Sequence, residues 1–116
     1  MRALIAGATG FVGTRLADAL VASGAEVRGV VRDRGRAGHL ERRGVELWEG
    51  DVLDASSLRG SGAGVDVGYY LVHSMGRGSD GDFEARERAA AANFAHTASA
   101  EGVERVVYLG GLGGDK

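Results

Sequence analysis

The sequence predicts an α/β fold in which a doubly wound parallel sheet carries helices on both faces. Short apolar segments alternate along the chain with longer segments in which apolar residues recur at helical spacing. The apolar segment at 65–72 is nearly continuous, which is typical of a parallel strand buried on both faces. Because strands separated by helical patterns form βαβ units, we expect about five strands in one sheet.

Turn and cap residues separate the expected elements. Gly24, Gly44 and Gly102 follow helical patterns at the place where a helix commonly ends. Asp54 stands where an N-cap is expected, directly before a short helical turn. The expected strands are 3–6, 26–31, 45–48, 65–72 and 105–109, and the expected helices are 11–22, 36–43, 55–58 and 82–101.

The composition predicts one soluble domain over residues 1–116. The chain is 44% hydrophobic and 26% charged, which is ordinary for a globular chain with a single core. A net charge of −2 argues against nucleic acid or an anionic membrane as a partner. Cysteine is absent, which excludes disulfides and thiolate chemistry, and no apolar run approaches the ~18 residues of a membrane span. We expect a cytoplasmic protein.

Three glycines, three residues apart, join the first expected strand to the first expected helix. In such a turn the first glycine permits a tight bend, the second lets a phosphate approach the backbone, and the third lets the helix pack closely. The N–H groups at the start of the helix then face the anion. We therefore expect a dinucleotide pyrophosphate here, although a turn without a ligand is the alternative. The expected contact residues are Gly7, Thr9, Gly10, Phe11, Val12 and Gly13.

The end of the second expected strand bears on the choice between NADP and NAD. An acid at this place commonly binds the ribose 2′-hydroxyl of NAD, whereas a nearby arginine accommodates the 2′-phosphate of NADP. The chain reads Arg32-Asp33-Arg34 here, and the planar guanidinium of Arg32 can bind a phosphate with two hydrogen bonds. NADP is therefore favoured, with NAD as the alternative if Asp33 reaches the ribose. A solvated charged loop without a ligand is the third interpretation.

Four segments together resemble the extended and atypical short-chain dehydrogenases/reductases. They are Gly7-Ala-Thr-Gly-Phe-Val-Gly13, Gly50-Asp51-Val52, Tyr69-Tyr-Leu-Val-His-Ser-Met75 and Val107-Tyr-Leu-Gly-Gly-Leu112. The chain is most similar to their NAD(P)H-binding, NmrA-like or nucleoside-diphosphate-sugar-epimerase-like group. This resemblance covers essentially the whole chain and implies a Rossmann-like sheet in the order 3-2-1-4-5. Because such proteins are two or more times longer, we expect this chain to correspond to their N-terminal nucleotide-binding part.

The resemblance also implies where the adenine end of the dinucleotide binds. It implies that the Asp51 carboxylate accepts a hydrogen bond from the adenine amino group, while the backbone N–H of Val52 meets the ring. Asp51 as the cap of the following turn is the alternative. Leu71, Val72 and His73 end the fourth expected strand, at the edge where open α/β sheets bind ligands. They are expected to flank the adenine ribose and the nicotinamide.

Two polar residues have less specific interpretations. For His73 we expect a hydrogen-bonding role, because no partner that would make it an acid or base is visible in the sequence. The three histidines of the chain show no metal-ligand spacing, so we expect no metal site. Asn93 lies within the last expected helix, where the resemblance implies that it supports the active site; simple helix packing is the alternative.

The chain departs from the resembled enzymes at the end of the fifth expected strand. Short-chain dehydrogenases carry a catalytic serine there, followed later by Tyr-x-x-x-Lys. This chain has Gly110-Gly111 in place of the serine, and Leu112 stands four residues after Tyr108. We therefore expect cofactor binding and assign no catalytic residue.

Three functional hypotheses remain open from the sequence. The first is an NAD(P)-binding domain of a reductase- or epimerase-like protein that presents NADP for redox chemistry on a small-molecule substrate. The second is a non-catalytic, NADP-dependent redox sensor. The third is a fragment without activity of its own, whose unpaired fifth strand would favour a homodimer.

Overall fold

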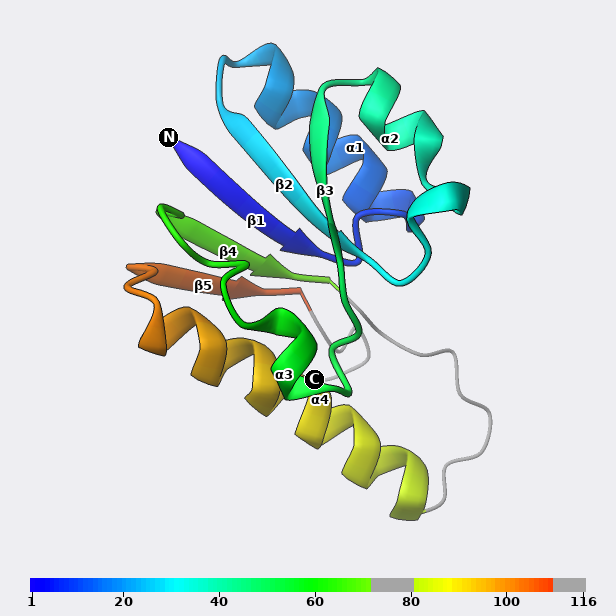
Figure 1. The fold of residues 1–116 in the computed structure, drawn as a ribbon, viewed down its shortest axis with the longest axis vertical. Coiled ribbons are helices and arrows are strands. Elements are labelled where there is room, and N and C mark those ends of the chain that lie inside the picture. The colour runs from blue at the N-terminus through cyan, green and yellow to red at the C-terminus, as the bar shows by residue number, and fades with distance from the viewer. Residues whose placement is uncertain (72–80, 110–116) are drawn as a thin grey trace.

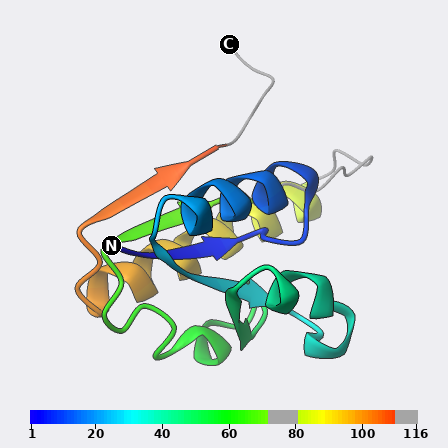
Figure 2. The same ribbon diagram turned by 90° about the horizontal axis from the view of Figure 1, so that it is seen from above.

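The computed structural model describes residues 1–71 and 81–109, and in the last helix it describes side chains from Glu84 onward. The strands form one parallel sheet in the order β3-β2-β1-β4-β5, which confirms the predicted topology (Figure 1). Figure 2 shows β5 at the outer edge of this sheet. The strands are β1 (Arg2–Ala6), β2 (Glu26–Val31), β3 (Val45–Glu49), β4 (Val67–Tyr70) and β5 (Arg105–Tyr108).

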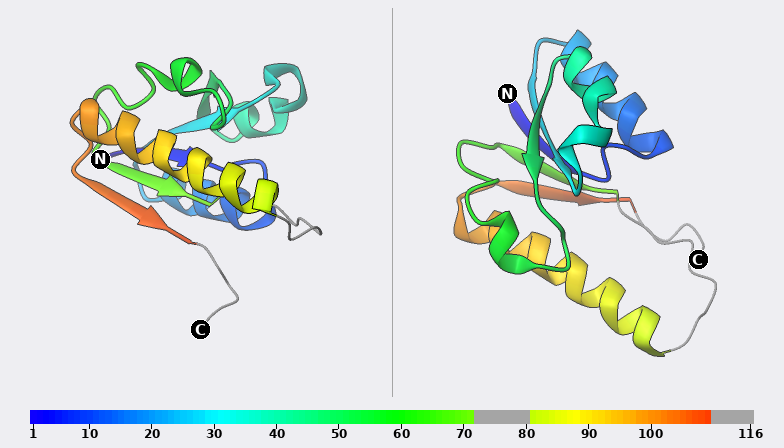
Figure 3. Two further views of the ribbon diagram at one scale, coloured as in Figure 1. Left: turned by 90° about the horizontal axis from the view of Figure 1, so that it is seen from below. Right: turned by 45° about the vertical axis from the view of Figure 1, so that its right-hand side comes forward.

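Helices cover both faces of the sheet, as expected for a doubly wound fold. One core cluster joins Ala17 of α1 and Leu40 of α2 to β1, β2 and β3. The other joins Leu58 of α3 and Phe94 of α4 to β1 and β4, and α4 runs along this face (Figure 3). Among the described helices, none is long and apolar enough to span a membrane. The helices are α1 (Phe11–Ala22), the 3₁₀ turn η1 (Arg34–Arg36), α2 (Gly38–Arg42), α3 (Ala55–Leu58) and α4 (Gly81–Ala100).

Two expected elements differ from the structure by more than one residue at an end. The strand expected at 65–72 is confined to Val67–Tyr70, because the N–H of Val65 donates to Gly62 O within a turn, and pairing with β1 starts at Val67. The helix expected at 36–43 is divided into η1 and α2. The Asp33 carboxylate accepts a hydrogen bond from Gly35 N (2.9 Å), which starts a 3₁₀ turn two residues early.

The first turn of α1 packs directly against the turn that precedes it. Gly7 has φ +99°, a left-handed conformation that favours glycine. A Cβ at position 13 would lie 1.9 Å from Gly7 O and 2.9 Å from Ala8 Cα, so a side chain cannot be accommodated there. The hydroxyl of Thr14 donates to Ala8 O at 3.0 Å and ties the helix to the same turn. The helix therefore starts in contact with the β1 turn.

Phe94 is the largest fully buried side chain of α4 among those that the structure describes. Its ring is 2% exposed and lies 5.4 Å from the Tyr70 ring, centroid to centroid. A Cβ at Gly68 would lie 3.2 Å from the Phe94 ring, so the glycine in β4 leaves the room that this ring occupies. Phe94 thus packs α4 against the sheet next to the carboxyl end of β4.

Replacement of Gly13 by alanine should destabilise the fold. The added methyl group would overlap backbone atoms of Gly7, and overpacking of this kind costs about 1–3 kcal/mol. Urea denaturation of Gly13→Ala measures the loss in the free energy of unfolding. Gly10→Ala is the control, because a Cβ there meets Gly7 O at 3.5 Å, an ordinary contact. Equal stability of Gly13→Ala and the parent chain would contradict the packing described here.

Truncation of Phe94 should be the more destabilising of two matched changes. Phe94→Ala removes a fully buried ring, and such truncations cost about 3–5 kcal/mol. Leu53→Ala, at a side chain that is 49% exposed, should change the free energy of unfolding by less than about 0.5 kcal/mol. Both values come from the same denaturation experiment. Similar losses in the two variants would show that Phe94 is not a core residue.

Candidate functional site

The candidate site lies at the carboxyl edge of the sheet, between β1 and β4, where the strand order reverses. From β1 the chain continues to β2 and β3 on one side, and it returns to β4 and β5 on the other. Leu71 N donates to Ala6 O at 2.8 Å just beyond this pair of strands. Open α/β sheets bind ligands in the crevice at such a switch point.

The N-terminus of α1 faces this edge without a capping side chain. Its N-cap is Gly10, in extended conformation (φ −78°, ψ 176°), and no side chain bonds to the cap. The first turn contains no acidic residue. Since the first N–H groups of a helix have no partner within the helix, they remain available to an external acceptor here. The positive end of the helix dipole favours an anionic one.

Gly10 is a glycine that the described part of the chain does not require. Its φ is negative, and a Cβ would have 3.5 Å to its nearest non-neighbouring atom. Serine, threonine, aspartate or asparagine would fit the backbone conformation and add a capping hydrogen bond. By contrast, Gly7 and Gly13 are needed by the turn itself. The space at position 10 is thus open among the described residues.

The two apolar residues expected at the glycine turn are exposed. Phe11 is 74% exposed and Val12 is 43% exposed, and Thr9 next to them is exposed as well. The guanidinium of Arg15 lies 4.5 Å from the centroid of the Phe11 ring. We did not identify Arg15 from the sequence, although its spacing of four residues from Phe11 on a helix is a recognisable signal.

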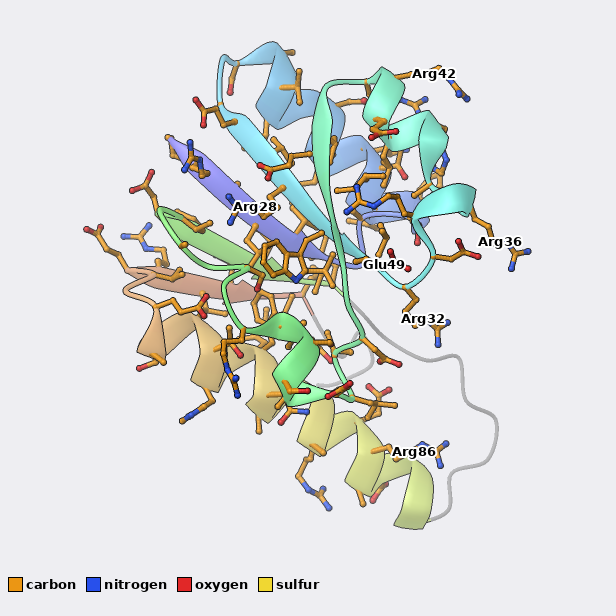
Figure 4. All side chains as sticks on the ribbon, in the orientation of Figure 1. Arg28, Arg32, Arg36, Arg42, Glu49 and Arg86 are labelled. Carbon is orange, nitrogen blue, oxygen red and sulfur yellow. The ribbon has the colours of Figure 1, made fainter. Side chains whose placement is uncertain are left out.

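The three charged residues after β2 have different surroundings. The side chain of Arg32 is exposed and points outward (Figure 4). The Asp33 carboxylate caps η1 through Gly35 N. Arg34 donates to Leu47 O at 3.3 Å and lies 3.9 Å from the Glu49 carboxylate. Of the three, only Arg32 has neither a hydrogen bond nor an ion pair to another described residue.

The loop after β3 is held in place by hydrogen bonds from two helices. One carboxylate oxygen of Asp51 accepts a hydrogen bond from Leu53 N at 2.9 Å. Asp51 therefore caps the turn that follows it, which was the alternative to adenine binding. Asp51 N donates to the Ser57 hydroxyl (2.9 Å), which orders the loop from α3. The Asn93 amide donates to Val52 O at 2.8 Å and orders it from α4. Asn93 therefore links α4 to the edge of the sheet that carries the candidate site.

Of the three residues expected at the end of β4, the structure describes only Leu71. Leu71 is 7% exposed and belongs to the core cluster on the α1 face. Val72 and His73, like Gly110 and Gly111, lie outside the described residues, so their roles stay predictions from sequence.

Tyr70 carries a buried hydroxyl that the sequence did not single out. Its oxygen has no hydrogen-bond partner among the described residues, and the ring lies 5.8 Å from that of Tyr108. Burial raises the pKa of Tyr70 to about 12, with the nearby Glu87 carboxylate acting in the same direction. The phenol is therefore protonated at neutral pH and is not a candidate general base. Within the described parts of the chain, no group of three His, Cys, Asp or Glu residues could hold a metal ion.

Comparison with known proteins shows which family this arrangement belongs to. A family model described as NAD(P)H-binding matches residues 7–116. A curated relative, the sterol demethylase protein B of Methylococcus capsulatus, is 33% identical, with 97% of this chain and 35% of the relative covered. The 2-alkyl-3-oxoalkanoate reductase of Shewanella oneidensis is 29% identical, with 91% and 27% covered.

A solved structure agrees with this family match. The triphenylmethane reductase of a Citrobacter species, in complex with NADP(H), has a TM-score of 0.74 and is 26% identical, with 95% of this chain and 37% of that chain covered. The chain therefore spans about a third of the length of the proteins it matches. The glycine turn, the uncapped α1 and the sheet order are those of a dinucleotide-binding domain. The chain belongs to the NAD(P)H-binding family.

Proposed function

We propose that this chain binds NADP at the carboxyl edge of its sheet and presents it for redox chemistry in a reductase-like protein. The proposal rests on the presence of glycine at position 10. The fold would accept a side chain there, and a polar side chain would cap the N-terminus of α1. A pyrophosphate on these N–H groups accounts for the glycine, because a Cβ would stand between the backbone and the anion.

The choice of NADP over NAD rests on the charged residues after β2. Arg32 is exposed and without a partner in the described chain, so its guanidinium is free to bind the 2′-phosphate in two-point fashion. Asp33 is the acid that would otherwise bind the ribose 2′-hydroxyl, and its carboxylate already caps η1. The NADP(H) named with the triphenylmethane reductase is in keeping with this choice.

The remaining expected residues would hold the adenine ring and the nicotinamide. Asn93 and the Ser57 hydroxyl order the Asp51–Val52 loop, and this loop would receive the adenine ring. Leu71 and the predicted Val72 and His73 would flank the ribose and the nicotinamide. When NADPH is bound, its reduced nicotinamide would supply the hydride, and this part of the chain would orient the ring.

The substrate of the whole protein is proposed as a small organic molecule, in line with the reductases named above. We assign no catalytic residue to this chain. Steady oxidation of NADPH with a panel of carbonyl compounds would support a reductase, whereas cofactor binding without turnover would favour the redox sensor of the NmrA-like branch.

Calorimetric titration of Gly10→Ala tests the carrying observation. We expect the parent chain to bind NADPH, and the added methyl group to weaken binding roughly tenfold or more by holding the pyrophosphate away from α1. The same variant should unfold at the same urea concentration as the parent chain, because its Cβ meets only ordinary contacts. Unchanged NADPH affinity in Gly10→Ala would remove the reason for placing a pyrophosphate here.

Arg32→Gln tests the cofactor preference. Loss of a charge-assisted pair with the 2′-phosphate should lower NADPH affinity by about tenfold or more, while NADH affinity should change by less than about twofold. Arg42→Gln is the matched control, because this exposed arginine at the far end of α2 precedes β3 and so lies at the amino edge of the sheet (Figure 4). Equal losses for both cofactors in Arg32→Gln would contradict the assignment to the 2′-phosphate.

A further inference from the structure

The Phe11–Arg15 pair brings a positive charge to the start of α1. Phe11 is the first residue of the helix, and its ring is 74% exposed. Residues four apart lie on the same side of a helix, and their side chains lean toward its N-terminus. The Arg15 guanidinium accordingly lies over the Phe11 ring, 4.5 Å from its centroid. The guanidinium is therefore held beside Phe11, the first residue of the helix.

This position is electrostatically unfavourable unless an anion is present. The helix dipole favours acids at the N-terminus and disfavours cations there. The first turn of α1 holds no acid, and no described carboxylate forms an ion pair with Arg15. Asp18, which is one turn further along α1, pairs with Arg43 at 3.1 Å. A cation and the positive end of a helix thus stand together without compensation from the described part of the chain.

Burial of apolar surface does not explain the contact between Phe11 and Arg15 either. The Phe11 ring is exposed and Arg15 is exposed, so an ordinary surface contact of this kind contributes little to stability. Phe11 instead offers Arg15 a rigid surface next to the uncapped N–H groups of α1. Holding the guanidinium there in advance lowers the entropic cost of using it to bind an anion.

We propose that Arg15 is a second binding group for the pyrophosphate of the dinucleotide, and that Phe11 positions it. This inference rests on the proposed function and adds to it a side-chain cation on α1. The role differs from that of Arg32, which follows β2 and would meet the 2′-phosphate present only in NADP. Because the pyrophosphate is common to NADP and NAD, Arg15 strengthens binding of both cofactors equally.

Titration of Arg15→Gln with NADPH and with NADH separates the two arginines. We expect affinity for both cofactors to fall by the same factor, roughly threefold to tenfold, as for a partly solvated ion pair. The dependence of binding on salt should also become weaker, because one screened charge has been removed. Arg42→Gln, which removes the same charge at the opposite edge of the sheet, should leave both affinities unchanged.

The positioning role of Phe11 has its own measurement. Phe11→Leu keeps an apolar side chain but removes the ring, and should weaken both cofactors by a smaller factor, about twofold to threefold. Added to Arg15→Gln, it should cause no further loss, since Phe11 acts through the guanidinium. Losses that multiply in the double variant would overturn this role. Thermal unfolding without cofactor verifies that each variant is folded.

The outcomes distinguish this inference from the proposed function. If the parent chain binds NADPH and Arg15→Gln binds it equally well, the inference is wrong and the proposed function stands. A loss confined to NADPH would also overturn it, because Arg15 would then act on the 2′-phosphate. If the parent chain binds neither cofactor, the proposed function fails and the inference fails with it.

Discussion

The close approach of α1 to the β1 turn is the constraint on which the rest of the site depends. Gly7 adopts a left-handed conformation, and the absence of a Cβ at Gly13 lets the first helical turn contact the carbonyl of Gly7. Thr14 adds a hydrogen bond to Ala8 O. Together these contacts direct the N-terminus of α1 to the switch point between β1 and β4. The exposed N–H groups, the Phe11 ring and the Arg15 guanidinium all take their positions from this turn.

Helix α4 supports the opposite side of the same edge. Phe94 packs into the space left by Gly68 and against Tyr70, which fixes α4 on the sheet next to the end of β4. One residue earlier on the helix, the Asn93 amide bonds to Val52 O and holds the loop after β3. A single helix therefore couples β4 to the Asp51–Val52 loop. In the proposed site these are the parts that receive the two ends of the cofactor.

The order of elements and the glycine turn were predictable because both depend on local patterns. Helical spacing and short apolar segments placed all five strands and the main helices, and the order 3-2-1-4-5 followed from the family resemblance. The predictions were wrong where a local hydrogen bond competes with periodicity. Asp33 starts a 3₁₀ turn before the expected helix, and a turn at Val65 delays β4 even though Val65 is buried. The loop hydrogen bond of Asn93 was one of two alternatives that the sequence left open.

By itself, the sequence determined the fold class and the place of the dinucleotide turn, since both depend on residue spacing along the chain, and its family resemblance predicted the strand order. Only the tertiary structure decided what each turn residue is for. It shows that the turn needs glycine at positions 7 and 13 but would accept a side chain at position 10. It also shows that the Asp33 carboxylate accepts a hydrogen bond within η1, whereas the Arg32 side chain is exposed. It also places Arg15 over Phe11 and buries the Tyr70 hydroxyl. The physical reason is that steric room, hydrogen-bond partners and burial are set by atoms that only the folded chain brings together.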